Sequence, residues 1–257
     1  MPGLPLVFRR VSAVLLVLSV GTTGACVGER PTLANETEPT TPTDGETTTT
    51  APAPPAKVAQ AKAETIDVYD DADATAPSSS ITAEEATAAP DIPIVFLVKD
   101  QEGRRLEVYL PTSPSGSTGW VSSSDVTVSS VTFRIEVSLS RHRVRVFDGD
   151  EEVLDEPASI GRSERPEPGV VYYIKELLQP PDDDGPYGTY AYGLSGFSTD
   201  LTSFDDGTGI IGIHGTDDPD SVGSDVRTGC IGLANDVITR LVDDIGLPLG
   251  TPVEIVT

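Results

Sequence analysis

The sequence predicts a mainly β protein, in which a small β-barrel-like domain precedes a β-sandwich-like domain that carries one short helix. Three observations support this class. From residue 65 onward, short runs alternate apolar with polar residues, as half-buried strands do. Turn sequences such as QEGR and DGD separate these runs. A single helical stripe follows near the end of the chain, whose 257 residues suffice for one or two domains.

The N-terminus has the features of an export signal. Arg9 and Arg10 precede VSAVLLVLSV, an apolar run too short to span a bilayer but typical of a signal peptide. Small residues in TTGAC then lead to Cys26, which is similar to a bacterial lipobox. We therefore expect residues 1–25 to be a lipoprotein signal peptide and Cys26 to carry a lipid that anchors the protein outside the cytoplasm. Cleavage of an ordinary secretory signal after Ala25 is the alternative.

The next two segments differ sharply in composition. Residues 26–64 are dominated by Thr, Pro, Glu and Ala, which predicts a disordered tether because few apolar groups are available for a core. Residues 65–130 contain TIDVYD, IVFLVKD and RRLEVYLP, which predict a small β domain. Within this domain, the acidic and Ala-rich segment 71–90 is expected to be a loop.

Residues 131–257 are expected to form the larger domain. FRIEVSL and RVRVF predict a hairpin, and His142 in its turn is expected to be solvated. GIIGIHG predicts a short strand that ends at His214. After Cys230, Asn235 is expected to be the N-cap of a helix that ends at Gly246. A closing strand, TPVEIV, follows the helix.

Three tyrosines lie in the Gly-rich stretch YGTYAYGLSGF, before the strand that is expected to end at His214. Tyr187, Tyr190 and Tyr192 favour core contacts, with a role facing a substrate as the alternative.

The charge of the chain limits its partners. The formal net charge is -24, from 41 acidic and 17 basic residues, so nucleic acid and anionic lipid headgroups are both disfavoured. We therefore expect no nucleic-acid partner, and membrane contact only through a lipid anchor. If Cys26 is lipidated, Cys230 is a lone exported thiol, which would be oxidised unless it has a use. A Cys26–Cys230 disulfide is the competing interpretation. The sequence does not indicate an oligomeric state.

His214 and Cys230 are candidates for a base and a nucleophile. An adjacent imidazole can accept the proton of a thiol, and a neighbouring glycine lets backbone N–H groups stabilise a tetrahedral intermediate. Gly215 follows the histidine and Gly229 precedes the cysteine. Zinc would require more soft ligands, and the aspartates between residues 217 and 225 lack the spacing of a calcium loop, so no metal or cofactor is expected.

The motifs IGIHGT, GCI and LAND resemble the active-site segment of the L,D-transpeptidases, the YkuD-type catalytic domain. In that family H-G-T is followed by a loop and then by S-H-G-C-I-R. Upstream, FRIEVSLSRHRVRVFDGDEEV, IGRSERPEPG and PYGTYAYGLSGF are also similar to the family, although Glu167 stands where Thr is usual. The resemblance covers residues 131–257. GSTGWVSSSDV resembles the small Src-homology-three-like barrel that precedes this domain in some actinobacterial lipoproteins.

The resemblance implies a function and a role for each matching residue. Cys230 would be the acylated nucleophile, His214 its base, and the carbonyl of Gly215 would orient the imidazole. The N–H groups of Thr228, Gly229 and Cys230 would form the oxyanion hole. The substrates would be peptidoglycan stem peptides, joined by 3→3 cross-links in cell-wall biogenesis and remodelling, and carbapenems would acylate the same cysteine. The protein would then face the cell wall.

Three residues around Cys230 depart from the family pattern. Thr228 replaces His, Arg227 replaces Ser, and Gly232 replaces Arg. The loss of the Arg removes a fixed guanidinium beside the reacting groups. Arg227 either compensates for this charge from the other side of Cys230 or points into solvent and leaves a slow enzyme.

The sequence also allows two other functions. One is a catalytically weak or inactive wall-binding module that retains the fold. The other is a sortase, which is disfavoured because the next arginine, Arg240, lies on an expected helix.

Overall fold

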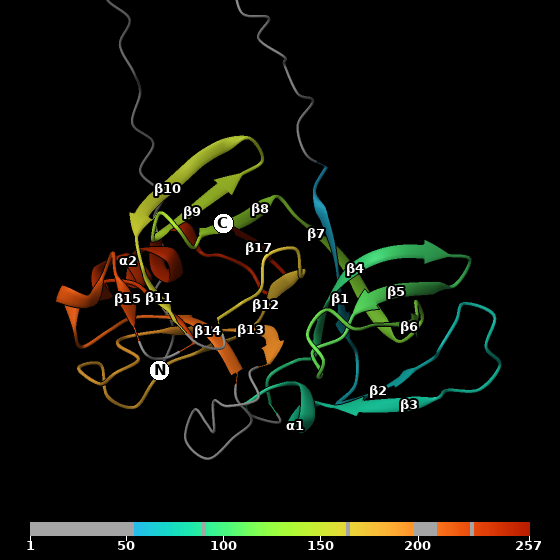
Figure 1. Cartoon of the computed structure of the whole chain (residues 1–257). Coiled ribbons are helices and arrows are strands. Elements are labelled where there is room, and N and C mark those ends of the chain that lie inside the picture. The colour runs from blue at the N-terminus through green and yellow to red at the C-terminus, as the bar shows by residue number, and fades with distance from the viewer. Residues whose placement is uncertain (1–53, 89–90, 163–164, 198–209, 227–228) are drawn as a thin grey trace, which may run out of the picture. The chain divides into compact units, whose positions relative to one another are not determined.

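The computed structural model describes residues 54–88, 91–162, 165–197, 210–226 and 229–257, without the side chain of Ile210 (Figure 1). The expected signal peptide, the lipobox cysteine Cys26 and most of the expected tether lie outside these residues, as do Arg227 and Thr228. The described chain is mainly β, as predicted, and its helices are too short to cross a bilayer.

The N-terminal β unit is built on a five-stranded sheet with the order β6-β5-β4-β1-β7, in which all neighbours are antiparallel. The strands of this sheet are β1 (Ala56–Ala61), β4 (Val95–Glu102), β5 (Arg105–Tyr109), β6 (Thr118–Ser122) and β7 (Val126–Val131). A two-stranded sheet of β2 (Thr65–Val68) and β3 (Ser79–Thr82) accompanies it, joined by a bridge between Tyr69 and Trp120. A shared core of Ile, Val, Leu and Phe side chains lies between them.

Two expectations for this unit were wrong. The expected tether, residues 26–64, includes β1, which is an inner strand because it pairs with both β4 and β7. The acidic segment 71–90, expected to be a loop, contains β3 and the helix α1 (Ala83–Ala86). A capping box accounts for α1, since the Thr82 hydroxyl accepts the N–H of Glu85 while the Glu85 carboxylate accepts that of Thr82.

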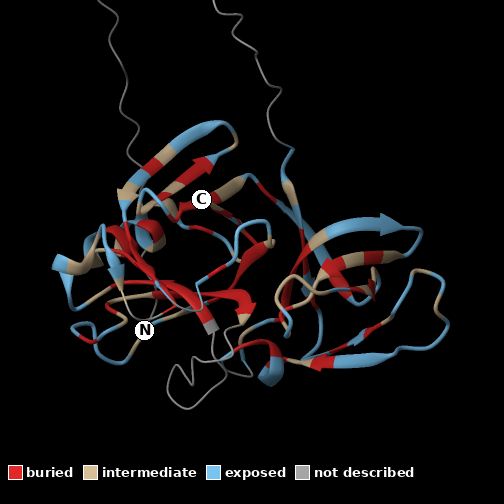
Figure 2. Ribbon diagram, in the orientation of Figure 1, coloured by how far each residue is buried: buried red, intermediate tan, exposed pale blue. Residues whose placement is uncertain are grey.

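The C-terminal domain is a ten-stranded sheet with the order β10-β9-β8-β17-β12-β13-β14-β16-β11-β15. Its strands are β8 (Phe133–Ser138), β9 (Arg143–Asp148), β10 (Glu151–Pro157), β11 (Ser159–Gly161), β12 (Tyr172–Leu178), β13 (Ala191–Phe197), β14 (Ile210–His214), β15 (Asp225–Val226), β16 (Ile231–Gly232) and β17 (Pro252–Val256). The predicted hairpin is β8–β9, and the predicted closing strand β17 lies parallel to β8. Buried residues follow the inner strands of both sheets (Figure 2).

The predicted helix follows Cys230, although its first turn differs from expectation. It comprises α2 (Asn235–Thr239) and a π-helical continuation, η2 (Arg240–Ile245). Ala234 is the N-cap, so Asn235 is the first helical residue and its side chain is available for other bonds. Gly246 ends the helix in the left-handed conformation at φ 69°, as expected. The stripe formed by Val237, Ile238 and Leu241 is buried against the sheet.

A buried ion pair attaches the end of α1 to strand β12. The ammonium of Lys175 lies 3.0 Å from a carboxylate oxygen of Glu176 and donates to the carbonyl of Ala86 at 2.5 Å. The other oxygen of Glu176 accepts the N–H of Ala88 at 2.6 Å. A register shift in β12 between Ile174 and Glu176 accompanies this arrangement.

Candidate active site

Two neighbouring parallel strands bring His214 and Cys230 to one place in the sheet. His214 is the last residue of β14, and Cys230 immediately precedes β16. In the register, Ile213 pairs with Ile231 and His214 with Gly232. The N–H of Leu233 also donates to the carbonyl of His214 at 2.8 Å. The fifteen residues between the histidine and the cysteine therefore connect two points that are fixed side by side in the sheet.

The hydrogen bond of His214 determines which ring nitrogen can act as a base. Nδ1 lies 2.5 Å from the carbonyl oxygen of Gly215. A carbonyl can only accept, so Nδ1 carries the proton and Nε2 of the neutral ring has a lone pair. This hydrogen bond is the one through which the Gly215 carbonyl was predicted to orient the imidazole. Such a ring is prepared to receive a proton at Nε2.

Burial keeps both candidate residues neutral. His214 is 7% exposed and Cys230 is 5% exposed. Burial lowers the pKa of His214, against the opposing effect of its bond to Gly215. Burial likewise raises the pKa of the Cys230 thiol, and a backbone hydrogen bond from Gly212 opposes this only in part. These two shifts favour a protonated thiol and a neutral imidazole at neutral pH.

Tyr187 extends the site on the histidine side. Its ring meets the ring of His214 edge to face, with centroids 5.2 Å apart and planes at 81°. Burial raises the pKa of Tyr187, and negative charge on Cys230 raises it further. Tyr192 lies in the core, and the hydroxyl of Tyr190 contacts Asp243 at 3.3 Å. Of the three tyrosines, Tyr187 is therefore the one that lies at the candidate site. Its position in a Gly-rich stretch was the only feature of the sequence that indicated this.

The predicted oxyanion hole is described only in part. Gly229 and Cys230 are both buried beside the start of β16. Thr228 and Arg227 lie outside the described residues, so the oxyanion role of Thr228 and the compensating role of Arg227 stay predictions. Among the residues that are described, Cys230 is in no disulfide.

Ser159 limits the space at Gly232, the position at which the family pattern has arginine. A Cβ at Gly232 would lie 2.3 Å from the hydroxyl oxygen of Ser159, on the paired strand β11. That hydroxyl donates to the carbonyl of Gly232 at 3.4 Å. Residue 232 is thus packed as a glycine, and a larger side chain needs a change at Ser159 as well.

One charged residue, Asp225, lies on β15, just before Arg227. Asp225 accepts a hydrogen bond from Nε2 of His142 at 2.9 Å, and Arg162 lies 3.7 Å away. The bond from His142 holds the pKa of Asp225 below its usual value. The expectation that His142 is merely solvated was therefore wrong. Its φ of 52° places it in the left-handed region, where the turn directs the ring at β15.

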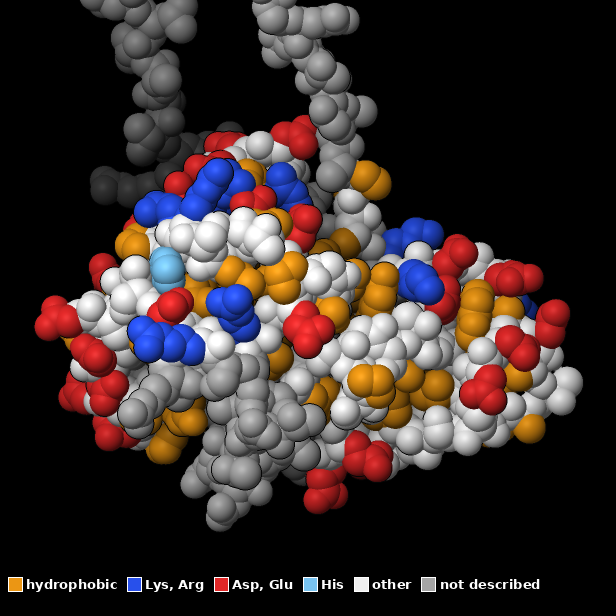
Figure 3. All heavy atoms as spheres, viewed as in Figure 1, with side chains coloured by type: hydrophobic (Ala, Val, Ile, Leu, Met, Phe, Trp, Pro, Cys, Tyr) orange, Lys and Arg blue, Asp and Glu red, His pale blue; other side chains and the backbone are white. Residues whose placement is uncertain are grey.

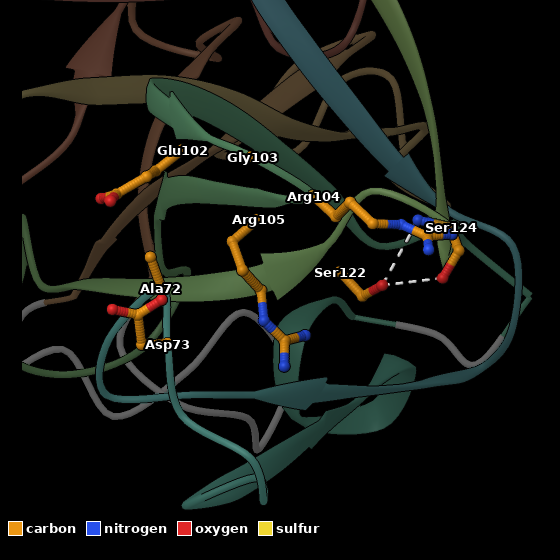
Figure 4. Close-up of a pocket in the computed structure, with 8 residues that line it drawn as sticks. All are labelled: Ala72, Asp73, Glu102, Gly103, Arg104, Arg105, Ser122 and Ser124. Carbon is orange, nitrogen blue, oxygen red and sulfur yellow. Dashed lines mark hydrogen bonds between the residues drawn. The ribbon is translucent and has the colours of Figure 1, made fainter.

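The hollows in the described part of the molecule include two of similar volume. One, of about 560 Å³, is lined by Tyr187, prolines of the 179–186 loop and Ala88. The other, of about 610 Å³, lies on the N-terminal unit between β4, β5 and β6, where Arg105 and Asp73 face it (Figure 4). Only the first adjoins the histidine ring, through Tyr187.

Charged side chains of both signs lie on the face of the molecule seen in Figure 3. Acidic side chains are scattered across the face seen in Figure 3. Within the described ranges, no group of three or more His, Cys, Asp or Glu side chains is placed to hold a metal ion.

Comparison with known proteins shows what the C-terminal domain is similar to. Residues 132–255 match the L,D-transpeptidase catalytic domain family, YkuD. The chain is 30% identical over 125 residues to YkuD of Bacillus licheniformis, covering 49% of the chain and 66% of that protein. It is 37% identical over 82 residues to YqjB of Bacillus subtilis, covering 32% of the chain and 42% of that protein. Both relatives are named as expected L,D-transpeptidases, and the chain spans less than two thirds of the length of each.

Solved structures with similarity to the chain include Bd1075 of Bdellovibrio bacteriovorus, with 29% identity, a TM-score of 0.35 and coverage of 49% of the chain and 47% of that structure. An L,D-transpeptidase from Mycobacterium smegmatis has 13% identity, a TM-score of 0.39 and coverage of 64% and 90%. The residues that match the family model, 132–255, include both His214 and Cys230.

Proposed function

Starting from an L,D-transpeptidase catalytic domain, we propose that the protein forms 3→3 cross-links between peptidoglycan stem peptides through an acyl-enzyme on Cys230. The observation that carries this proposal is the arrangement of the two buried residues. The Gly215 carbonyl holds Nδ1–H of His214, and burial keeps the thiol protonated until a base acts on it. This favours general-base activation of a cysteine nucleophile.

In the first half-reaction, His214 takes the thiol proton at Nε2 as the sulfur attacks the carbonyl of the third residue of a donor stem. The backbone N–H groups near Gly229 and Cys230 stabilise the resulting oxyanion. The C–N bond to the terminal D-alanine then breaks, and His214 returns the proton to the departing amine. A thioester on Cys230 remains.

In the second half-reaction, the side-chain amine of an acceptor stem attacks this thioester. His214 removes a proton from the attacking amine and returns it to the sulfur as the C–S bond breaks. A new amide bond joins the two stems and the thiol is restored. The hollow lined by Tyr187 lies next to the residue whose ring contacts His214, so we expect a stem peptide to approach from this side.

Muropeptide analysis after incubation with purified disaccharide tetrapeptide tests the proposal. The unmodified protein is expected to release D-alanine and to produce a 3→3 linked dimer. Cys230→Ala is the matched control and is expected to give neither product. Release of D-alanine at the same rate by both proteins would refute the acyl-enzyme on Cys230.

A second candidate is a wall-binding module with little or no turnover. The observation that favours it is Gly232, which stands where the family has arginine and where an added Cβ would meet the hydroxyl of Ser159. Binding to isolated peptidoglycan that persists in Cys230→Ala, with no cross-linking by the parent protein, would support this function. If Arg227 compensates for the missing arginine, the unmodified protein should form cross-links and Arg227→Ala should lose this activity.

We further propose that the domain acts outside the cytoplasm, tied to the membrane by lipid on Cys26. The support is the basic, apolar and small-residue order of the first 26 residues. Mass spectrometry of the mature N-terminus is expected to find diacylglycerol on Cys26. A mature chain that begins at this position without the lipid mass would overturn the anchor.

A further inference from the structure

One side chain after the cysteine is bonded to both loops that flank His214. Asn235 begins α2, five residues after Cys230. Its Oδ1 accepts the N–H of Thr216 at 3.0 Å, and its Nδ2 donates to the carbonyl of Asp183 at 3.4 Å. Thr216 follows His214 by two residues, and Asp183 belongs to the loop that carries Tyr187.

The bond to Thr216 acts on the carbonyl that orients the histidine. The carbonyl of Gly215 and the N–H of Thr216 belong to the same planar trans peptide unit, so they point in opposite directions. Fixing the N–H against Asn235 therefore fixes the direction of the carbonyl, which accepts Nδ1–H of His214. The N–H of Gly215, in turn, is held by the carbonyl of Tyr190 at 3.1 Å.

Close packing restricts movement at this junction. A Cβ at Gly215 would lie 2.1 Å from Oδ1 of Asn235, and a Cβ at Gly188 would lie 2.0 Å from the same atom. Gly188 also has a φ of 61°, which favours glycine independently. Two glycines are therefore needed to admit the Asn235 amide between the loops.

We propose that Asn235 is a positioning residue, which holds the Gly215–Thr216 peptide so that His214 presents Nε2 as the base for Cys230. The helix that follows the nucleophile is thereby linked to the group that orients the base. The same side chain holds the Tyr187 loop through Asp183, which keeps the tyrosine edge against the imidazole. This inference rests on the proposed function only in taking His214 and Cys230 as base and nucleophile.

The test measures the rate at which iodoacetamide alkylates Cys230 as a function of pH, a readout that requires no peptidoglycan substrate. Asn235→Ala removes both bonds. Asn235→Asp keeps an acceptor for the Thr216 N–H, and Asp236→Asn changes the exposed neighbouring residue as a control. Near-ultraviolet circular dichroism checks that each variant is folded.

Asn235→Ala is expected to lower the alkylation rate at pH 7 by about tenfold to a hundredfold, because a misplaced base no longer takes the thiol proton. The midpoint of its pH profile should move upward, toward that of a buried thiol without a base. Asn235→Asp should recover most of the rate, and Asp236→Asn should match the unmodified protein.

An unchanged rate and midpoint in folded Asn235→Ala would overturn the inference. If Asn235→Ala does not fold, the test uses Asn235→Asp, which keeps an acceptor for the Thr216 N–H. A folded Asn235→Asp whose pH profile is as impaired as that of His214→Gln would show that the bond to Thr216 does not position the base. Failure of the proposed function looks different. The unmodified protein would then show the lower midpoint of a base-assisted thiol, lost in Asn235→Ala, yet form no cross-linked muropeptide.

Discussion

Two buried polar pairs of the C-terminal domain differ in how the protein compensates for their burial. Lys175 and Glu176 are 2% and 0% exposed, and each is matched by the other's charge and by a backbone group of the 86–88 segment. His214 and Cys230 are nearly as buried, yet both are neutral at rest. The first pair stabilises a junction in the fold. In the proposed mechanism, the second transfers a proton from the sulfur to the imidazole when Cys230 attacks a stem peptide.

The comparison predicts that the two pairs fail in different ways when one member is removed. The largest effect should come from His214→Gln, because glutamine cannot take the proton of a thiol whose pKa burial has raised. We expect acylation of Cys230 by a carbapenem to slow by about a hundredfold to ten-thousandfold. Stopped-flow fluorescence or quenched mass spectrometry gives the rate, and thermal unfolding should change little. A loss of less than threefold would show that His214 is not the base.

Glu176→Gln should instead reduce stability and spare the chemistry. An unpaired buried Lys175 is expected to lower the free energy of unfolding by about 3–5 kcal/mol, measured by urea denaturation at pH 7. The double variant Lys175→Met with Glu176→Gln should recover much of this loss, since neither charge then remains buried alone. The exposed pair Lys99–Glu107, 2.7 Å apart, supplies the control, and Lys99→Met should change stability little. Equal effects at the two sites would contradict the contrast.

A smaller effect on stability is expected at Gly232, where β16 pairs with β11. Gly232→Arg restores the family residue but forces its Cβ against the hydroxyl of Ser159, so unfolding should become easier by about 1–3 kcal/mol. Ser159→Ala in the same protein should relieve most of this, because the Cβ of residue 159 is at an ordinary contact distance of 3.7 Å. Thermal unfolding of the single and double variants distinguishes packing from charge. A single variant as stable as the parent would refute the packing argument.

The smallest expected effect concerns pH. Burial lowers the pKa of His214 from 6.5, so the unfolded chain takes up its proton at a higher pH than the folded one does. The stability contributed by this neutral ring is present above pH 6.5 and is lost as the pH falls from there through the lower folded pKa. His214→Gln should flatten unfolding free energies in this window. An acid limb of acylation centred above pH 6.5 would contradict a lowered pKa.

The sequence predicted most of the C-terminal domain because its signals are local. The alternation in FRIEVSL and RVRVF, and the stripe of Val237, Ile238 and Leu241, are each set by one face of one element. The proximity of His214 and Cys230 was also inferred from the motif, since each stands at the edge of an apolar run with a glycine beside it.

What the sequence did not reveal depends on pairing between distant segments. AKVAQA contains one β-branched residue, Val58, and becomes β1 only because β4 and β7 offer it hydrogen bonds on both edges. Lys175 and Glu176 resemble the exposed charges of an ordinary strand until the 86–88 segment covers them. The side-chain bonds of Asn235 require two loops that are far from it in sequence.

The central claim is that Cys230 is a nucleophile activated by His214, and intact-protein mass spectrometry with a carbapenem tests it most directly. The folded protein with a reduced thiol is expected to gain the mass of one carbapenem, located on Cys230 by peptide mapping. Cys230→Ala should gain none, and His214→Gln should gain it far more slowly. A folded, reduced protein that acquires no adduct, or acquires it as fast without His214, would contradict the account.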